Sequence, residues 1–170
     1  REQIVPIEME LRIAENYMYL QKMRFGSRIQ YQVNTPEDVS HIRIPSFTMQ
    51  PLVENAIVHG LSKKEQGGTV SVTVTEDPTS EIVTLLIEDD GLGIAEERLS
   101  ALNARMHNPE ENKTARIGIG LGNIYCRIRT LYPEGGDLRI DAKEGVGTRI
   151  TLTIPQEREG VEPRPALEGV

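Results

Sequence analysis

The sequence predicts an α+β fold, a two-layer α/β sandwich in which helices cover one face of a mixed, mostly antiparallel sheet. Alternating β-branched segments and amphipathic segments both occur, but without the regular strand–helix alternation of a parallel sheet. The stretch 81–87 is almost wholly apolar, which is typical of a central strand. The 170 residues, 38% of them hydrophobic, suffice for one substantial core.

The first expected element is an amphipathic helix over residues 6–25, ended by Gly26. Apolar residues recur along it at spacings of three and four, which is typical of the buried face of a surface helix. These residues are Met9, Ile13, Tyr17, Leu20 and Met23.

The remaining elements are expected in chain order, beside a short helix near residue 55 that is treated below. Strands are expected at 28–33, 41–45, 69–75, 81–87, 137–142 and 148–154. Helices are expected over 95–106 and from about 123 to 132, the latter with Ile124, Ile128 and Leu131 facing inward. A flexible connector over 62–68, a mobile loop over 107–117 and a poorly ordered tail after Pro155 complete the chain.

Composition and charge exclude several classes of function. A net charge of −7, a pI near 5.1 and an aromatic content of 4% without tryptophan argue against a nucleic-acid-binding surface. The single cysteine, Cys126, excludes an internal disulfide and a cysteine-based zinc site. No apolar run reaches the length of a membrane span, and no signal peptide is evident. Because the chain begins at Arg1, we expect it to be a fragment of a longer protein.

The most informative stretch is a short helix expected to start at Pro51 and to stop at Gly60. It is apolar except for Glu54, Asn55 and His59. A buried carboxamide without a partner costs about 1–3 kcal/mol, so Asn55 needs a polar partner. Its carbonyl oxygen suits Mg²⁺, a cation that prefers oxygen ligands. Glu54 can orient or deprotonate a nucleophile or be an exposed helix carboxylate, and His59 fits a structural role better than a ligand role.

The first glycine-rich segment follows the expected central strand. Asp89 ends this strand, and Gly91 and Gly93 allow the backbone to turn tightly and to approach a flat ligand. A carboxylate at that place can accept a hydrogen bond from an exocyclic amine such as that of adenine. The alternative is an ordinary strand-to-helix turn in which the aspartate caps the helix.

The second glycine-rich segment, which contains Gly118 and Gly120, opens a helix. The free N–H groups of a helix start favour a phosphate. The preceding loop over 107–117 carries Lys113 and Arg116 and can close as a lid over phosphates. A simple solvated loop is the alternative.

Taken together, four segments resemble the N, first-glycine, second-glycine and closing Gly-Thr motifs of the Bergerat-type ATPase and kinase domains. In chain order they are 54–60, 89–93, 118–123 and 145–148. The segments 6–25, 44–55 and 123–128 resemble more specifically the LytS/YesM-like bacterial sensor histidine kinases.

The resemblance implies that the chain binds ATP and Mg²⁺. Asn55 is then the Mg²⁺ ligand, Glu54 the activating carboxylate, and Asp89 the acceptor for the adenine amino group, assisted by Thr148 through a water molecule. The other implied nucleotide contacts are His59, Gly91, Gly93, Ile94, Arg116, Gly118, Gly120, Leu121 and Gly122. The chain departs from the family pattern at Asp90, where asparagine is usual, and at Gly122, where a longer polar residue is usual.

The resemblance also implies a partner, because the phosphorylated histidine of such kinases lies on a dimerisation helix upstream of the ATP-binding domain. None of His41, His59 and His107 lies in such a helix. We therefore expect a linker helix at 1–26, a catalytic ATP-binding domain at 27–155 and a disordered tail at 156–170. The expected context is a homodimeric, membrane-anchored bacterial kinase whose cytoplasmic domain phosphorylates its own phosphoacceptor domain and serves a response regulator.

Two other functions remain open. The chain can be an ATP hydrolase like the heat-shock chaperone or DNA mismatch-repair ATPases, with Glu54 activating water. It can also be a non-catalytic module that binds a partner protein in a nucleotide-dependent way.

Overall fold

A computed structural model describes residues 3–108 and 119–156 of the chain. The predictions for Lys113, Arg116 and Gly118, for most of the loop 107–117 and for the tail after Gln156 lie outside the described residues.

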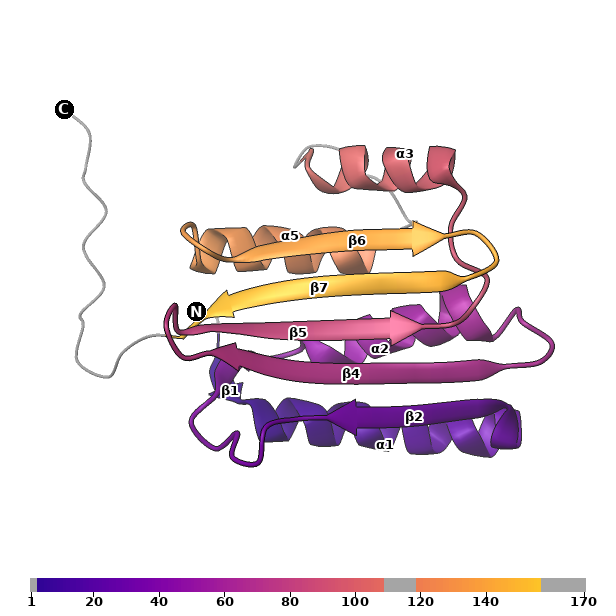
Figure 1. The fold of residues 1–170 in the computed structure, drawn as a ribbon, viewed down its shortest axis with the longest axis horizontal. Helices are drawn as coiled ribbons and strands as arrows, with labels where there is room; N and C mark the ends of the chain where they lie inside the picture. The colour runs from indigo at the N-terminus through magenta and orange to yellow at the C-terminus, as the bar shows by residue number, and fades with distance from the viewer. Residues whose placement is uncertain (1–2, 109–118, 157–170) are drawn as a thin grey trace.

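A five-stranded mixed sheet forms one layer of the domain. Its spatial order is β2-β4-β5-β7-β6, with β2 parallel to β4 and the other neighbours antiparallel (Figure 1). The strands are β2 (Ile29–Asn34), β4 (Gly68–Asp77), β5 (Ile82–Asp89), β6 (Asp137–Lys143) and β7 (Gly147–Pro155). The central position of β5 explains why its sequence is almost wholly apolar.

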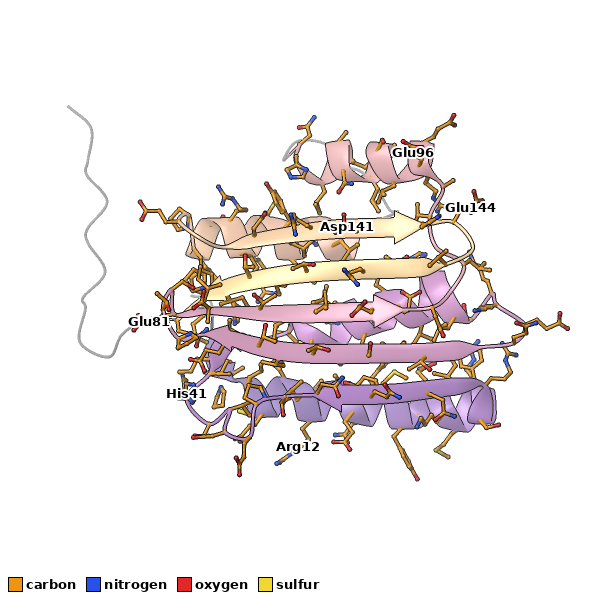
Figure 2. The ribbon with its side chains drawn as sticks, in the orientation of Figure 1. Arg12, His41, Glu81, Glu96, Asp141 and Glu144 are labelled. Carbon is orange, nitrogen blue, oxygen red and sulfur yellow. The ribbon has the colours of Figure 1, made fainter. Side chains whose placement is uncertain are left out.

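Three helical elements cover one face of the sheet, as predicted. They are α1 (Ile7–Phe25), α2 (Met49–Asn55) with its continuation η2 (Ala56–Leu61), and α5 (Ile119–Leu131) (Figure 1). The fourth helix, α3 (Glu96–Met106), lies beside the edge strand β6. Figure 2 looks onto the opposite sheet face, where exposed polar side chains such as Asp141 stand.

Alternation along the strands assembles the core between the two layers. Every second residue is buried over 70–74 in β4, 83–87 in β5 and 150–154 in β7, as are the inner residues of α2 and α5. The largest of these side chains include Leu52, Ile57, Leu85, Ile87 and Ile128. Of the helix positions predicted to face inward, Ile124 and Ile128 are buried and Leu131 is partly buried.

The sequence did not reveal a small second sheet. Strand β1 (Ile4–Pro6) pairs with β3 (Arg43–Pro45) in antiparallel orientation, directly before α1. Three residues are too few to show a period of two, so β1 carried no readable signal. A short 3₁₀ turn, η1 (Gly26–Arg28), separates α1 from β2.

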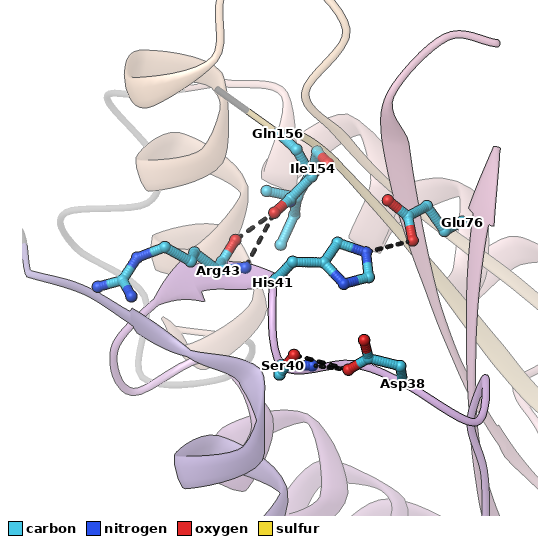
Figure 3. Close-up of polar contacts among 7 residues, drawn as sticks. All are labelled: Asp38, Ser40, His41, Arg43, Glu76, Ile154 and Gln156. Carbon is cyan, nitrogen blue, oxygen red and sulfur yellow. Dashed lines mark hydrogen bonds and ion pairs between the residues drawn. The ribbon is translucent and has the colours of Figure 1, made fainter. Parts of the chain in front are cut away.

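Polar contacts close the end of the sheet that lies farther from Asp89 (Figure 3). Gln156 accepts a hydrogen bond from the Arg43 amide at 2.9 Å and donates one to the Arg43 carbonyl at 3.1 Å. The His41 imidazole contacts the Glu76 carboxylate at 2.7 Å, which ties the loop before β3 to β4.

Helix α1 was predicted correctly, but its predicted buried face was wrong except at Tyr17, which is partly buried against the core. Met9, Leu20 and Met23 are 53%, 61% and 72% exposed, and Ile13 is also exposed. The buried residues are Ile7, Glu10, Ala14 and Met18. The helix is apolar on two faces. The face that is buried contains the small Ala14, and it brings Glu10 to its hydrogen-bond partners at the start of α2.

The buried residues of α1 belong to the same core as the sheet. The domain boundary expected after residue 26 stays a prediction. Among the helices that the structure describes, none combines the length and hydrophobicity needed to cross a membrane.

Candidate nucleotide-binding site

The helix that carries Asn55 is longer than the sequence suggested. It begins at Met49, so Pro51 lies inside the first turn, where its missing N–H is not needed. It also passes through Gly60 to Leu61, so the predicted stop at Gly60 is wrong. The last turns are π-helical, and the Ser62 amide donates to the Ile57 carbonyl at 2.9 Å. Such π segments occur frequently at functional sites.

A buried carboxylate from α1 fixes the start of this helix. Glu10, only 2% exposed, accepts hydrogen bonds from the backbone amides of Thr48 at 2.6 Å and Met49 at 3.2 Å. A negative charge at a helix N-terminus satisfies free N–H groups and offsets the positive end of the helix dipole. Sequence reasoning missed this role because the wrong face of α1 was taken as buried.

Glu54 and Asn55 occupy the middle of the continuous helix. Glu54 is exposed and Asn55 is half-buried. Among the residues that the structure describes, the Asn55 carboxamide has no hydrogen-bond partner, which leaves its oxygen available to a ligand. The negative charge of Glu54 reaches Tyr17, whose pKa is raised first by burial and then by Glu54.

His59 is an exposed residue of η2. Partial desolvation lowers its pKa, and the positive charges of Lys63 and Arg98 lower it further. The imidazole is therefore neutral at physiological pH, which allows it to accept as well as donate a hydrogen bond.

Asp89 ends the central strand, and Thr148 of β7 lies directly opposite. Oδ1 of Asp89 accepts a hydrogen bond from the Gly91 amide at 2.9 Å. Burial is the main cause that raises the pKa of Asp89 to about 6, against the hydrogen bonds from the Gly91 and Thr148 amides. Asp90 raises this pKa and Lys64 lowers it.

The two predicted ends of the site meet where η2 crosses the first glycine loop. A Cβ at Gly60 would lie 2.6 Å from Oδ1 of Asp89, and a Cβ at Gly91 would lie 2.5 Å from the Gly60 carbonyl carbon. The Leu92 amide points at the Gly60 carbonyl oxygen at 3.4 Å. A side chain at position 91 would clash with the Gly60 backbone, and one at position 60 would displace the Asp89 carboxylate, so this crossing sets Asp89 at a fixed place relative to the helix of Asn55.

The other loop glycines also have packing reasons. Gly93 has φ of +69°, and a Cβ there would lie 1.9 Å from the Lys143 carbonyl oxygen. Gly147 has φ of +147°, and a Cβ there would lie 2.0 Å from the Asp89 carbonyl oxygen. The turn between β6 and β7 therefore packs against the loop after Asp89. Ile94 follows and packs against the core.

Within the second glycine segment, Gly120, Leu121 and Gly122 lie in the first turn of α5, which packs against α2. Gly120 is exposed, and a Cβ there would meet no atom of the described residues within 4 Å. Leu121 and Gly122 are buried, so the Leu121 side chain belongs to the core and leaves only its backbone for a ligand. Gly118 and Arg116 lie outside the described residues.

Comparison with known proteins identifies the family. Residues 45–158 match the family described as histidine kinase-, DNA gyrase B-, and HSP90-like ATPase. The chain belongs to this family. Sensor histidine kinase YesM of Bacillus subtilis is 32% identical over 161 residues, which cover 95% of this chain and 26% of YesM. Sensor protein LytS of Oceanobacillus iheyensis is 32% identical over 154 residues, which cover 91% of this chain and 26% of LytS.

Solved structures agree with the family at the level of the fold. The catalytic domain of histidine kinase ThkA superposes with a TM-score of 0.65 at 17% identity, covering 92% of this chain and 96% of that domain. The blue-light activated histidine kinase domain from Erythrobacter litoralis gives a TM-score of 0.57. The chain thus has the fold of a histidine kinase catalytic domain and spans about a quarter of the length of the YesM and LytS relatives.

Proposed function

We propose that this chain binds Mg·ATP and presents the γ-phosphoryl group to a histidine on a separate domain of the same parent protein. The observation that carries the proposal is the crossing at Gly60, which holds the Asp89 carboxylate against the helix of Asn55. One side chain is suited to adenine and the other to a phosphate-bound cation.

At the adenine end, Asp89 accepts a hydrogen bond from the exocyclic amino group. With a pKa of about 6, the carboxyl group is mostly ionised at neutral pH and can act as an acceptor. Thr148 lies opposite Asp89 on β7 and is the proposed partner of a bridging water. Gly91, Gly93 and Ile94 form the wall beside the base.

At the phosphate end, the Asn55 oxygen is the protein ligand for Mg²⁺. No group of three or more His, Cys, Asp or Glu side chains within 3–108 and 119–156 could hold a metal ion. The donor set suits Mg²⁺ bound by one protein oxygen, phosphate oxygens and water. Bound in this way, Mg²⁺ neutralises phosphate charge. His59, Arg116, Gly118, Gly120, Leu121 and Gly122 are the remaining proposed contacts.

Glu54 lies on the same helix as Asn55 but points to solvent. An imidazole from another domain can therefore reach it, and the carboxylate can orient that imidazole in line with the phosphoryl group. Catalysis then consists mainly of positioning and electrostatic stabilisation. The proposed parent is a dimeric bacterial membrane kinase whose cytoplasmic phosphoacceptor domain is the substrate and whose response regulator receives the phosphoryl group.

Calorimetric titration with Mg·ATP tests the site. Asn55→Asp should abolish the metal-dependent affinity for ATP, because the neutral carboxamide becomes a carboxylate whose negative charge repels the phosphate groups. Asp89→Asn should weaken binding of adenine nucleotides. The matched controls are Asn34→Asp and Asp141→Asn, which change the same residue types at exposed strand positions. Unchanged Mg·ATP affinity in both site variants would contradict the assignment.

ATP hydrolysis is the second candidate function, because the matched family includes gyrase B-like and HSP90-like ATPases and because Glu54 is open to water. Steady phosphate release by the purified chain, lost in Glu54→Gln, would favour it. Nucleotide binding without hydrolysis or transfer to a histidine-bearing domain would favour a non-catalytic partner-binding module.

A further inference from the structure

We propose that Lys64 and Asp90 form a clamp that positions Asp89 for adenine, tying the connector after η2 to the first glycine loop. The inference rests on the proposed function, since it assigns two positioning residues to the nucleotide site. The connector is the segment 62–68, which the sequence predicted to be flexible.

Lys64 joins the connector to the glycine loop. Its Nζ donates a hydrogen bond to the Asp90 carbonyl oxygen at 2.6 Å. The Lys64 backbone is itself anchored: its amide donates to the Leu61 carbonyl at 3.0 Å, and its carbonyl accepts from the Gly67 amide at 2.8 Å. Arg28 also donates to that carbonyl, at 3.2 Å. Hydrogen bonds thus hold Lys64 both at its backbone and at its ammonium group.

Asp90 makes the second half of the clamp. Its Oδ1 accepts a hydrogen bond from the Thr69 amide at 2.7 Å, where the connector enters β4. A Cβ at Gly68 would lie 2.0 Å from the same oxygen, so glycine is required for this approach. The Asp90 side chain is thus occupied by the connector.

The clamp acts on Asp89 through position and through charge. The backbone that follows Asp89 is held at two points. Gly91 packs against Gly60 of η2, and the Asp90 carbonyl accepts the hydrogen bond from Lys64. The charged groups that act on the Asp89 carboxylate are Lys64 from the connector and Asp90 from its own loop. The β7 side contributes the Thr148 amide, and η2 contributes the uncharged Gly60.

The charge of Asp90 acts on Asp89 in the opposite direction to that of Lys64. A carboxylate beside Asp89 disfavours the ionised form of Asp89, which adenine requires. The Lys64 ammonium counters that effect and also holds the loop. A carboxamide at position 90 would keep the Thr69 contact without this opposing charge.

The test measures Mg·ATP affinity between pH 5 and pH 8 in four variants. Lys64→Met removes the ammonium group that holds the Asp90 carbonyl and should weaken Mg·ATP binding about 5- to 30-fold. The loss of affinity on acidification should begin at a higher pH than in the wild type. Lys64→Arg keeps a cationic donor and should restore most of the affinity. Asp90→Asn keeps the Thr69 contact, and its loss of Mg·ATP affinity on acidification should begin at a lower pH than in the wild type. Lys22→Met is the matched control, because Lys22 is an exposed lysine on α1, and it should match the wild type.

Titration of the Asp89 carboxyl carbon by NMR, without nucleotide, provides an independent readout. Its pKa should rise in Lys64→Met and fall in Asp90→Asn. Unmoved or same-direction pKa shifts would overturn the clamp, as would weakened binding in Lys64→Met that Lys64→Arg does not restore. If the wild type itself fails to bind Mg·ATP, the proposed function fails, and the carboxyl titration still decides whether the clamp exists.

Discussion

The crossing of η2 and the first glycine loop makes a sharp prediction for Gly60→Ala. The added methyl carbon would lie 2.6 Å from Oδ1 of Asp89 and 2.9 Å from its Cγ. Ordinary contacts begin near 3.4 Å, so the carboxylate has to retreat by the difference, about 0.8 Å. The 2.9 Å hydrogen bond from the Gly91 amide cannot survive such a shift unchanged.

The magnitude follows from two opposing effects. A hydrogen bond to a charged group contributes about 1.5–3 kcal/mol, whereas alanine in place of glycine in a helix favours folding by up to about 1 kcal/mol. The free energy of unfolding should therefore fall by about 0.5–2 kcal/mol. Adenine-nucleotide affinity should fall by about tenfold or more, since the displaced carboxylate no longer faces the base.

A double-mutant cycle with Asp89→Ala tests this reasoning by thermal and urea denaturation. Asp89→Ala removes the three atoms closest to the new methyl group, so Gly60→Ala should be neutral or stabilising in that background. An equal loss of stability from Gly60→Ala in both backgrounds would refute the argument.

Three further predictions follow from buried or paired charges. Glu10→Ala should lower the free energy of unfolding by about 2–3 kcal/mol in urea titrations, because two amides at the start of α2 lose their acceptor, whereas Glu8→Ala, an exposed neighbour, should change it little. The pKa of Asp89 is about 6 when folded, against an ordinary value of 3.8, so this carboxyl group binds more protons in the folded state between these values, and its contribution to stability should fall as pH rises from about 4 to about 6. The difference between the ordinary and the folded pKa of Asp89 corresponds to at most about 3 kcal/mol, and solvent screening reduces this to about 1–2 kcal/mol. Asp89→Asn should flatten the profile, and an unaltered slope would contradict the assignment. The hydrogen bond to Glu76 raises the pKa of His41 above 6.5, so its stabilising effect should be complete below that pH and be lost as pH rises through the folded pKa; Glu76→Gln should remove this dependence in thermal unfolding curves.

Much of the fold was predictable because period and composition carry it. The apolar run in β5 indicated a central strand, and the glycine-bounded segments indicated the loop after Asp89 and the start of α5. The buried face of α1 was not predictable from periodicity, because two apolar stripes compete on that helix. Only the position of α2, whose start needs the Glu10 carboxylate, decides between them.

Within the site, residue types at motif positions were predictable and their contacts were not. Asn55 and Asp89 stand out in the sequence as polar residues in apolar surroundings. The stop predicted at Gly60 was wrong because glycine is needed there for the close approach of Asp89, and a sequence cannot distinguish that need from helix termination. Lys64 reads as one charge in a polar connector, and only the three-dimensional path brings it to the Asp90 carbonyl.

Phosphoryl transfer to histidine can be followed directly with labelled nucleotide. The purified chain is mixed with a phosphoacceptor domain of the parent kinase and γ-labelled Mg·ATP, and protein-bound phosphate is followed. We predict an acid-labile, alkali-stable phosphohistidine on the added domain with the wild-type chain, and none with Asn55→Asp. Nucleotide binding without any phosphohistidine, or steady phosphate release in its place, would contradict the claim.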